Sequence, residues 1–416
     1  MRILKTTQTY YPYLSKGGPP AKVKGIARAL SRRGHEVTVL TADLGETVEA
    51  FAGRDWRRER TKGDWGWEWQ DEGVKAIYLK ALAHYRATTI SPRVLEFCLR
   101  RLADFELVHV YGLYDLLGSV VARFCRRRDL PYVIEPLGMF QPKMRSLQKK
   151  RLYHALIGDA LFGGAGMVIA TSETERQELI LGGIADEKIA LRRNGLDLDE
   201  FQSLPARGAL RAKLGLGENE RLVLFLGRLS FIKGLDVLVR AFGEIAGTHS
   251  DVRLVIAGPD DEDGCREEIL RLVSKLKVEH RVSLPGPLYA DQKLQALADA
   301  DLFVLPSQYE SFGNAAAEAI ACGVPVLVTK GCGIAPLIDE RVGLVVECTT
   351  EGLRAGLKRL LDDRALLADL RSRCAIVGPE FSWDEPVEEM ERLYSSLIAA
   401  KNLPRPVAVA QSQTLL

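Results

Sequence analysis

Short apolar runs separated by polar turns recur along the whole chain and predict its secondary structure. Their length and their lack of apolar–polar alternation are typical of strands that are buried on both faces. Segments with helical spacing, such as 21–33 and 116–128, separate several of these runs. Strands that alternate with helices favour an α/β fold, in which helices cover both faces of a mostly parallel sheet. In the first half of the chain the runs are 2–6, 36–41, 107–111, 132–135 and 167–171.

A second series of strands begins near residue 222 and predicts a second domain of the same kind. A chain of 416 residues is longer than one hydrophobic core usually serves, which also favours two domains. The runs of this series are LVLFLG at 222–227, RLVIAG at 253–258, LFVLP at 302–306 and VPVLVT at 324–329.

The junction between the two domains is predicted near residue 203. Segment 199–219 contains Pro205, several glycines and few long apolar runs, a composition typical of a connection. After the second series, one stretch has helical spacing and the end of the chain becomes Pro-rich and then polar, which is typical of a flexible tail. The predicted parts are a first domain at 1–203, a second domain at 204–380, a helix at 381–400 and a flexible tail at 401–416.

Composition and charge exclude several classes of protein. Hydrophobic residues make up 47% and charged residues 27% of the chain, which excludes a disordered or fibrous protein. The formal net charge is only +2, from 57 basic and 55 acidic residues, so nucleic acid is not an expected partner. Seven cysteines without a C-x-x-C pair fit neither a disulfide framework nor a zinc site, and we expect a reducing compartment.

The apolar segments are also too short to cross a membrane. The segment MRILKTTQTYYPYLSKGG lacks the apolar core of a signal peptide, and no apolar run reaches about 18 residues. We therefore expect a cytoplasmic protein that can lie on the inner face of the cell membrane without spanning it.

The segment PSQYESFGNAAAEAIACGVPVLV, at 306–328, contains the densest set of candidate site residues. It predicts a loop that leaves the carboxyl end of a buried strand and then a helix that begins near Asn314. Ligands bind at the carboxyl ends of parallel strands, and a helix N-terminus presents free N–H groups to anions. The backbone around 312–315 is therefore a candidate site for a diphosphate.

Two glutamates in this segment are candidate ligand-binding residues. Glu310 lies in the loop before the helix, and Glu318 lies about one turn inside the helix. In dinucleotide-binding folds an acidic residue accepts hydrogen bonds from a ribose, which is a candidate role for Glu318. In the alternative reading, Glu318 is stabilised only by the helix dipole and Glu310 is an ordinary loop residue. Spacing alone leaves both readings open.

A pair of cations follows the strand at 222–227. Arg228 comes directly after this strand, and Lys233 lies just before the next predicted helix. Two cations beyond the end of a strand can neutralise a leaving diphosphate without a metal ion. Taken alone, such a pair is more typical of a solvated surface, but its position beside the Glu310 segment favours a phosphate site.

Five segments in order carry a resemblance to a known family. They are ESFGNAAAE at 310–318, GRLSFIKGLDVL at 227–238, AGPDDEDG at 257–264, RRNGLDLDEF at 192–201, and the pair Gly17–Gly18 followed by RGHEVTVLT at 33–41. From residue 2 to about 400 the chain resembles the family 4 retaining glycosyltransferases. The resemblance implies the GT-B fold, in which two Rossmann-like domains face a cleft and the last helix, here 381–400, crosses back to the first domain.

The resemblance also implies roles for individual residues. Arg228 and Lys233 match the pair that binds the donor diphosphate. Glu310 matches the acid that contacts the transferred sugar, and Glu318 matches the acid that binds the donor ribose. The other implied donor-binding residues are Gly17 and Gly18 in the loop facing the cleft, and Phe312, Gly313 and Asn314 through their backbone.

The implied activity is transfer of a hexose-type sugar from a nucleotide diphosphate sugar to a glycan or lipid-linked acceptor in cell-surface polysaccharide biosynthesis. Retention would arise by same-face attack, in which the leaving diphosphate accepts the proton of the acceptor. No metal or other cofactor is implied. The Asp-x-Asp pairs at 197–199 and 299–301 have local explanations as a turn and as the approach to a strand.

On the acceptor side the chain departs from the family in one position. The segment FELVHVYGLYD, at 105–115, resembles a stretch that ends in His-x-His-Gly, but here only His109 is present and Tyr111 takes the second place. An apolar strand around His109 also fits a packed core residue. We assign His109, Tyr111 and Glu135 to the acceptor side.

The stretch that follows Glu135 resembles the acceptor region of exopolysaccharide-type members. Its cations can bind an anionic membrane or a lipid diphosphate, but they equally fit the solvated face of a helix. These cations are Lys143, Arg145, Lys149, Lys150 and Arg151.

Three rival functions were weighed. A GT-B nucleotide-sugar epimerase would share the fold but not the Glu310–Glu318 segment. A catalytically inactive sugar-binding or scaffold protein would be expected to lack at least one of four residues that are all present here. A nicotinamide-dependent enzyme is excluded, because no G-x-G-x-x-G follows the first strand. The four residues are Arg228, Lys233, Glu310 and Glu318.

Overall fold

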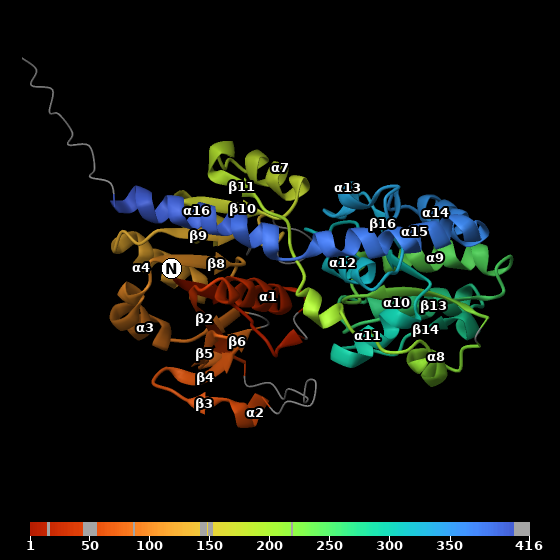
Figure 1. Ribbon diagram of the computed structural model, residues 1–416, viewed down its shortest axis with the longest axis horizontal. Coiled ribbons are helices and arrows are strands. Elements are labelled where there is room, and N and C mark those ends of the chain that lie inside the picture. Colours follow the sequence, from red (N-terminus) through yellow and green to blue (C-terminus); the bar gives the residue numbers. More distant parts are fainter. Residues whose placement is uncertain are drawn as a thin grey trace, which may run out of the picture.

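The computed structural model describes residues 1–14, 17–44, 56–85, 88–141, 148, 153–217 and 219–402. It forms two lobes, each built on one open sheet with helices on both faces (Figure 1). The predicted α/β fold with two parallel-sheet domains is therefore confirmed. The part of the predicted tail that follows Asn402 lies outside the described residues.

The first lobe contains a nine-stranded sheet. Its strands are β1 (Arg2–Thr7), β2 (Glu36–Asp43), β3 (Thr61–Lys62), β4 (Gly66–Asp71), β5 (Val74–Lys80), β8 (Leu107–Tyr111), β9 (Tyr132–Glu135), β10 (Met167–Ala170) and β11 (Ile189–Leu191). The spatial order is β11-β10-β9-β8-β1-β2-β5-β4-β3. Pairing is parallel from β11 to β5, and β4 and β3 add an antiparallel edge. The order of the parallel strands changes direction between β1 and β8.

Helices and one hairpin cover this sheet. The hairpin follows β5 and consists of β6 (Ala83–Tyr85) and β7 (Thr88–Ile90). The α-helices are α1 (Pro19–Arg32), α2 (Trp56–Glu59), α3 (Arg93–Arg101), α4 (Leu116–Arg127), α6 (Asp159–Gly163) and α7 (Glu173–Leu181). Shorter 3-10 and π elements are η2 (Leu102–Asp104), η3 (His154–Gly158), η4 (Asp186–Lys188) and η5 (Leu198–Phe201).

The second lobe contains a six-stranded, entirely parallel sheet. Its strands are β12 (Arg221–Leu226), β13 (Val252–Ala257), β14 (Val282–Ser283), β15 (Leu302–Leu305), β16 (Val326–Thr329) and β17 (Gly343–Val346). The order β14-β13-β12-β15-β16-β17 is the Rossmann order, with its change of direction between β12 and β15.

Eight α-helices and three 3-10 helices are described in this lobe. The α-helices are α8 (Ala209–Leu214), α9 (Leu235–Ala246), α10 (Cys265–Lys275), α11 (Ala290–Asp299), α12 (Asn314–Ala321), α13 (Ala335–Ile338), α14 (Thr350–Asp362) and α15 (Arg364–Val377). The 3-10 helices are η6 (Phe231–Lys233), η7 (Glu279–Arg281) and η8 (Gly378–Phe381).

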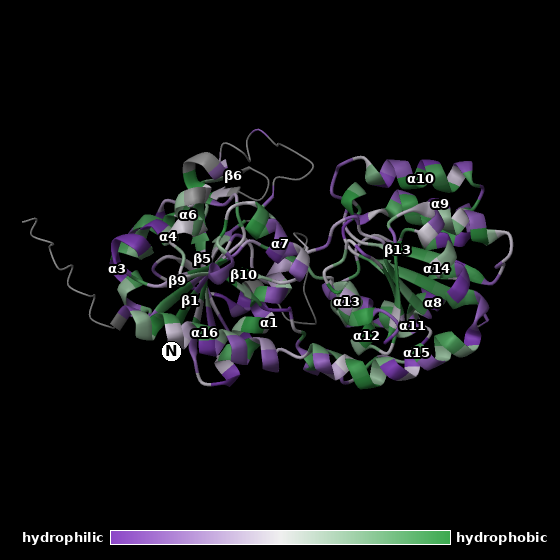
Figure 2. Cartoon of the chain, turned by 90° about the horizontal axis from the view of Figure 1, so that it is seen from above, coloured by the Kyte–Doolittle hydropathy of each residue, from purple (hydrophilic) through white to green (hydrophobic). Residues whose placement is uncertain are grey.

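The last helix, α16 (Asp384–Asn402), returns to the first lobe as expected. Figures 1 and 2 show α15 and α16 following one another along the same side of the two lobes. Trp383, Val387, Met390 and Tyr394 are buried in the core of the first lobe. A Cβ at Gly25 of α1 would lie only 2.3 Å from Nε1 of Trp383, so a glycine allows this close contact.

The chain enters the second core before it reaches the second sheet. Leu196 and Phe201 already pack in the second hydrophobic cluster, although β12 begins only at Arg221. The junction that we proposed at residue 203 lies between η5 and α8.

The central strands of both sheets are buried, as their apolar runs in the sequence predict. All five residues of β8 are buried, and so are the last five of β12. Figure 2 shows the hydrophobic colour along the strands inside each lobe. No helix in the described part of the chain is both long and apolar enough to cross a membrane.

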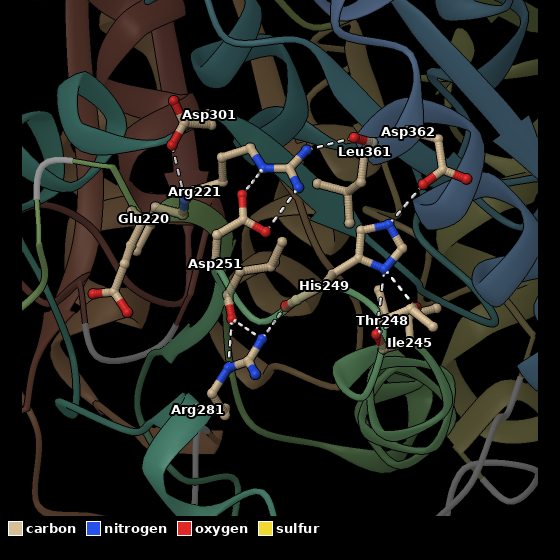
Figure 3. A network of polar contacts seen from close by, with 12 residues as sticks. Glu220, Arg221, Ile245, Thr248, His249, Asp251, Arg281, Asp301, Leu361 and Asp362 are labelled. Atoms are coloured by element: carbon tan, nitrogen blue, oxygen red, sulfur yellow. Dashed lines mark hydrogen bonds and ion pairs between the residues drawn. The ribbon is translucent and has the colours of Figure 1, made fainter.

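A polar network secures the amino ends of the strands in the second lobe (Figure 3). The guanidinium of Arg221 donates to the carboxylate of Asp251 at 2.7 Å and to the carbonyl of Leu361. Arg281 donates to the carbonyl oxygens of Val252 and of His249. This network lies at the amino edge, opposite the carboxyl edge whose loops form the candidate site.

Candidate functional site

A cavity of about 460 Å³ lies at the carboxyl edge of the second sheet, and loops of both lobes line it. The loops after β12, β13 and β15 contribute most of its lining, next to the point where the strand order changes direction. The first lobe contributes the loop after β9. The charged lining residues are Arg228, Lys233, Asp261, Asp263 and Glu310.

The predicted loop and helix at 306–321 form one wall of this site. Gly313 caps α12 with a φ of 123°, and a Cβ there would lie 2.8 Å from Cγ2 of Ile334. The side chain of Phe312 is buried in the second core and anchors the loop. The loop is paired through the amide of Glu310, which donates to the carbonyl of Gly331 at 2.9 Å. Helix α12 therefore begins three residues after Ser311, which lines the cavity, and its N-terminus lies next to the candidate site.

Lys233 and Glu310 form an ion pair at the cavity. Lys233 ends the 3-10 helix η6, and the chain then turns through Gly234, which has a φ of 64°. A Cβ at Gly234 would lie 2.1 Å from the carbonyl oxygen of Pro306, so the turn needs a glycine. The turn packs the two loops together and brings Lys233 next to Glu310, and their roles in donor binding stay predictions.

Arg228 forms a second ion pair with an acid that the sequence analysis did not assign. Its Nη1 lies 2.6 Å from Oδ1 of Asp261, and the two side chains are 40% and 34% exposed. An isolated bridge joins Leu229 to Asp260, so the loops after β12 and β13 run side by side. The run DDED directly after a predicted strand was the signal that could have identified this acid.

The glycine loop of the first lobe reaches these residues, as predicted. A Cβ at Gly17, which has a φ of 94°, would lie 3.5 Å from Nε of Arg228. A Cβ at Gly18 would lie 3.6 Å from Nδ2 of Asn314. Asn314 is also hydrogen-bonded across the lobes, because its Oδ1 accepts from Nδ2 of Asn194 at 2.9 Å. The glycine loop thus lies beside Arg228, one of the two cations proposed to bind the diphosphate, and beside the start of α12.

Glu318 lies beside α11 rather than in the lining of the cavity. Its Oε1 accepts from Nζ of Lys293 at 3.0 Å. Burial lowers the pKa of Lys293, but the charge of Glu318 outweighs this effect and raises the pKa above its ordinary value. The ribose-binding role of Glu318 stays a prediction.

The three residues assigned to the acceptor side lie inside the first lobe. His109, Tyr111 and Glu135 are each 2% exposed or less, and none of them lines the cavity. The phenol oxygen of Tyr111 accepts from Nζ of Lys5 at 2.7 Å, so Tyr111 does not take the place of the second family histidine at the site. Their assignment to the acceptor side stays a prediction.

Glu135 is instead the centre of a buried charge cluster. It forms ion pairs with Lys22 and with Arg192, the latter at 2.5 Å, and Nε2 of His109 lies 3.5 Å away. Burial alone raises the pKa of Glu135, but the charges of Arg192 and Lys22 outweigh it and hold the pKa well below its ordinary value. Burial lowers the pKa of Lys22 to about 8 and that of His109 to about 3.

A second buried glutamate, Glu175, holds the cavity loop of the first lobe. Its carboxylate accepts from the amides of Gly138 at 2.6 Å and of Thr171 at 2.8 Å. Gly138 packs against the donor-side loop, because a Cβ there would lie 3.0 Å from Cβ of Ser311. Sequence reasoning missed Glu175, since an acid in the first turn of a helix is usually exposed and stabilised by the helix dipole.

One further prediction, the local role of the Asp-x-Asp pair at 299–301, has a structural outcome. The carboxylate of Asp299 accepts from the amide of Arg211 at 2.9 Å, which agrees with a local role for this Asp-x-Asp pair. In the described part of the chain no group of three or more His, Cys, Asp or Glu is arranged to hold a metal ion. The basic residues predicted to face a membrane, at 143, 145, 149, 150 and 151, lie outside the described residues.

Comparisons with known proteins agree with this architecture. Residues 17–195 match the model of the glycosyl transferase 4-like domain, and residues 206–378 match that of the glycosyl transferases group 1. A D-inositol 3-phosphate glycosyltransferase of Catenulispora acidiphila is 32% identical over 74% of this chain and 77% of its own length. An uncharacterised glycosyltransferase of Methanocaldococcus jannaschii is 25% identical over 95% of this chain and 98% of its own length.

Solved structures establish the same fold. Anabaena HepE, in complex with UDP and glucose, superposes with a TM-score of 0.75 at 20% identity, over 95% of this chain and all of that one. Sucrose-phosphate synthase from Thermosynechococcus elongatus superposes with a TM-score of 0.74 at 23% identity, over 96% of this chain and all of that one. Both likenesses extend over the two lobes, so the predicted GT-B fold is confirmed.

Proposed function

This chain belongs to the group 1 glycosyltransferases of the GT-B type, and from that premise we propose that it transfers a hexose, with retention of configuration, from a nucleoside diphosphate sugar to a glycan or lipid-linked acceptor. The observation that carries the proposal is the convergence of Arg228, Lys233 and Glu310 on one cavity, whose lining ends at Ser311, shortly before α12. The first lobe closes this cavity and would present the acceptor. We place the reaction in cell-surface polysaccharide biosynthesis, on the cytoplasmic face of the membrane.

The donor diphosphate would bind between the two cations and the N-terminus of α12. Both cations already have an anionic partner in the same cavity, so a phosphate oxygen can take the place of a carboxylate, and water at the open cavity can solvate the displaced carboxylate. As the bond to the sugar breaks, Arg228 and Lys233 would stabilise the charge on the leaving diphosphate. Glu310 would orient the sugar.

The environment of the acids supports same-face attack rather than a covalent intermediate. Asp263 accepts hydrogen bonds from the hydroxyl of Ser230 and from the amides of Phe231 and Cys265. Asp261 is paired with Arg228. Asp263 is therefore held by protein groups, and Asp261 is released only where a donor phosphate takes its place on Arg228, whereas a retaining double displacement needs a carboxylate free to attack the sugar. The leaving diphosphate would accept the proton of the acceptor.

The test is turnover of UDP-, GDP- and ADP-hexoses by the purified chain in the presence of a chelator. We compare the wild type with Glu310→Gln, which keeps the shape of the side chain. Glu347→Gln is the matched control, because Glu347 is paired with Lys330 at the surface, away from the cavity lining. Loss of turnover in Glu310→Gln alone supports the proposal. A folded wild type that neither binds nor turns over any donor contradicts it and favours a sugar-binding scaffold.

The configuration of the product tests retention separately. Proton spectra of the newly formed glycoside report the anomeric coupling directly. A product with the same anomeric configuration as the donor supports same-face attack, and an inverted product contradicts it.

A further inference from the structure

The first lobe exposes a cluster of large apolar side chains at its hairpin and at helices α3 and α4. We name this cluster the leucine surface; its five side chains are between 39% and 72% exposed. The other exposed large hydrophobics of the described chain lie apart from this cluster in the fold. They are Leu181 at the end of α7, Leu191 at the end of β11, Leu204 between η5 and α8, Leu270 of α10 and Ile376 of α15. The leucine surface consists of Leu82, Ile90, Leu95, Leu99 and Leu116.

These side chains form one continuous surface. Leu82 and Ile90 adjoin one another, because the amide of Leu82 donates to the carbonyl of Ile90 at 2.9 Å. Ile90, Leu95 and Leu116 line a single groove of about 240 Å³. Leu99 lies one turn after Leu95 on α3 and extends the same face.

The groove itself is almost entirely apolar. Besides aliphatic side chains it is lined by Pro92 and by two hydroxyl residues, Thr89 and Ser91. Neither hydroxyl oxygen has a hydrogen-bond partner among the described residues, and both residues are more than nine-tenths buried. Both hydroxyl oxygens are themselves buried, so the groove offers almost only apolar contact, which suits the acyl chains of a lipid.

Positive charge surrounds the apolar side chains. Helix α3 contains three arginines and one glutamate, and α4 contains three arginines and no acid. This local excess contrasts with the formal charge of +2 for the whole chain. On α4 the groove residue Val120 is followed at helical spacing by Arg123 and Arg127, so cations continue the face that the groove begins. Apolar side chains bordered by arginines favour an anionic lipid surface over a neutral one.

The leucine surface lies at the same edge of the sheet as the candidate site. The hairpin follows the carboxyl end of β5, and Leu116 begins the helix that follows β8. The cavity loop at 136–141 follows the carboxyl end of the neighbouring strand β9. A membrane against the leucine surface would therefore lie beside the acceptor side of the cavity.

We propose that the leucine surface docks the first lobe onto an anionic bilayer and presents a lipid-linked acceptor to the cavity. Large exposed apolar patches commonly mark interaction sites, and Leu side chains flanked by Arg are typical of interfacial binding. The identity of the acceptor rests on the proposed function, whereas the docking itself does not. The two can therefore fail separately.

The experiment is co-sedimentation of the full chain with vesicles of phosphatidylcholine alone or mixed equally with phosphatidylglycerol. The test variant is Leu95→Ser with Leu99→Ser. The matched control is Leu270→Ser with Ile376→Ser, which removes two exposed apolar side chains from the second lobe. A charge variant, Arg123→Gln with Arg127→Gln, shows how much of the vesicle binding is electrostatic. All these side chains are exposed, so each variant should fold, and a thermal melt checks this.

Wild type and control should bind the anionic vesicles, and the leucine variant should bind about tenfold or more weakly. Binding to the neutral vesicles should be weaker, and the arginine variant should lose much of the preference for anionic lipid. Equal binding by wild type and leucine variant overturns the proposal. So does a dimer in solution that the leucine variant abolishes, because the surface would then bind a second copy. Donor turnover, measured on the same preparations, reports the proposed function independently.

Discussion

The two lobes place clusters of charge at equivalent positions of equivalent sheets, but they bury them differently. In the first lobe, the ion pair of Lys22 with Glu135 is sealed, with side chains 5% and 0% exposed. In the second lobe, Arg228 and Lys233 are paired with acids in the lining of an open cavity. The strand order changes direction next to both clusters.

This difference in burial separates a structural cluster from a binding site. A buried charge destabilises the folded state unless an opposite charge lies beside it, so removal of one partner is costly in free energy. Charges at an open cavity can exchange a carboxylate for a phosphate oxygen, since water and the incoming ligand compensate them. The same topological position is therefore sealed in one lobe and open to the proposed ligand in the other.

The largest expected effect is on stability, for Glu135→Gln. The substitution leaves Lys22 and Arg192 without a buried counter-charge, and we expect the free energy of unfolding to fall by about 3–5 kcal/mol. Denaturant titration measures this change. The control is Glu347→Gln, whose exposed ion pair should contribute less than about 1 kcal/mol. Equal stability of the two variants would contradict the assignment of Glu135 to a sealed cluster.

Next in size is the loss of catalysis in Lys233→Ala. Removing a group that stabilises charge on the departing diphosphate should reduce kcat by about 100-fold to 1000-fold. Because the side chain of Lys233 is only 14% exposed, the unfolding midpoint of the variant is measured as well, to show that it is folded at the assay temperature. Steady-state kinetics with the donor found in the screen measures the effect, and Lys330→Ala, at the surface, is the control. An unchanged kcat with a normal fold would exclude Lys233 from the reaction.

A smaller effect is expected on the pH dependence of stability, through His109. Its pKa is lowered by burial to about 3 in the folded chain, against an ordinary value of 6.5. The unfolded chain therefore binds a proton that the folded chain does not. The contribution of neutral His109 is fully present above pH 6.5 and is lost as the pH falls toward 3, at up to about 1.4 kcal/mol per pH unit.

Urea titrations of wild type and His109→Asn between pH 7 and about 5.5 measure this contribution, because most carboxylates titrate below that range. The variant should show a flatter dependence of the unfolding free energy on pH. His35→Asn, which removes a less buried histidine, controls for the loss of an imidazole as such. Equal slopes for His109→Asn and the wild type would show that His109 is protonated in the folded chain.

The smallest effect concerns Asp261→Asn. Asp261 forms an ion pair with Arg228, so the donor must displace its carboxylate. Asp261→Asn should therefore tighten the binding of the matching nucleoside diphosphate by about threefold, as expected when one partly exposed like charge is lost. Calorimetric titration measures the Kd. The neighbouring Asp260→Asn is the control, because Asp260 accepts from the amide of Glu262 instead. Weaker binding in Asp261→Asn would mean that Asp261 positions Arg228 for the phosphate.

Part of the site could be predicted because its residues follow strands directly. Arg228 comes two residues after the end of β12 and Glu310 five after the end of β15. Parallel pairing of these strands brings their carboxyl ends to one edge, so the encounter of Lys233 with Glu310 follows from the pattern. Asp261 follows β13 in the same way, but its run of acids resembles an ordinary solvated turn.

The sequence by itself determined the alternation of strands and helices, and with it two parallel sheets and the edge at which ligands bind. The tertiary structure alone decided which of the charges at those edges face solvent. Burial depends on what packs over a strand end, and in the first lobe Tyr394 of α16 contacts His109 across 285 positions of the chain. Local patterning does not encode such a contact, because it arises only when the last helix crosses back and seals the cluster around Glu135.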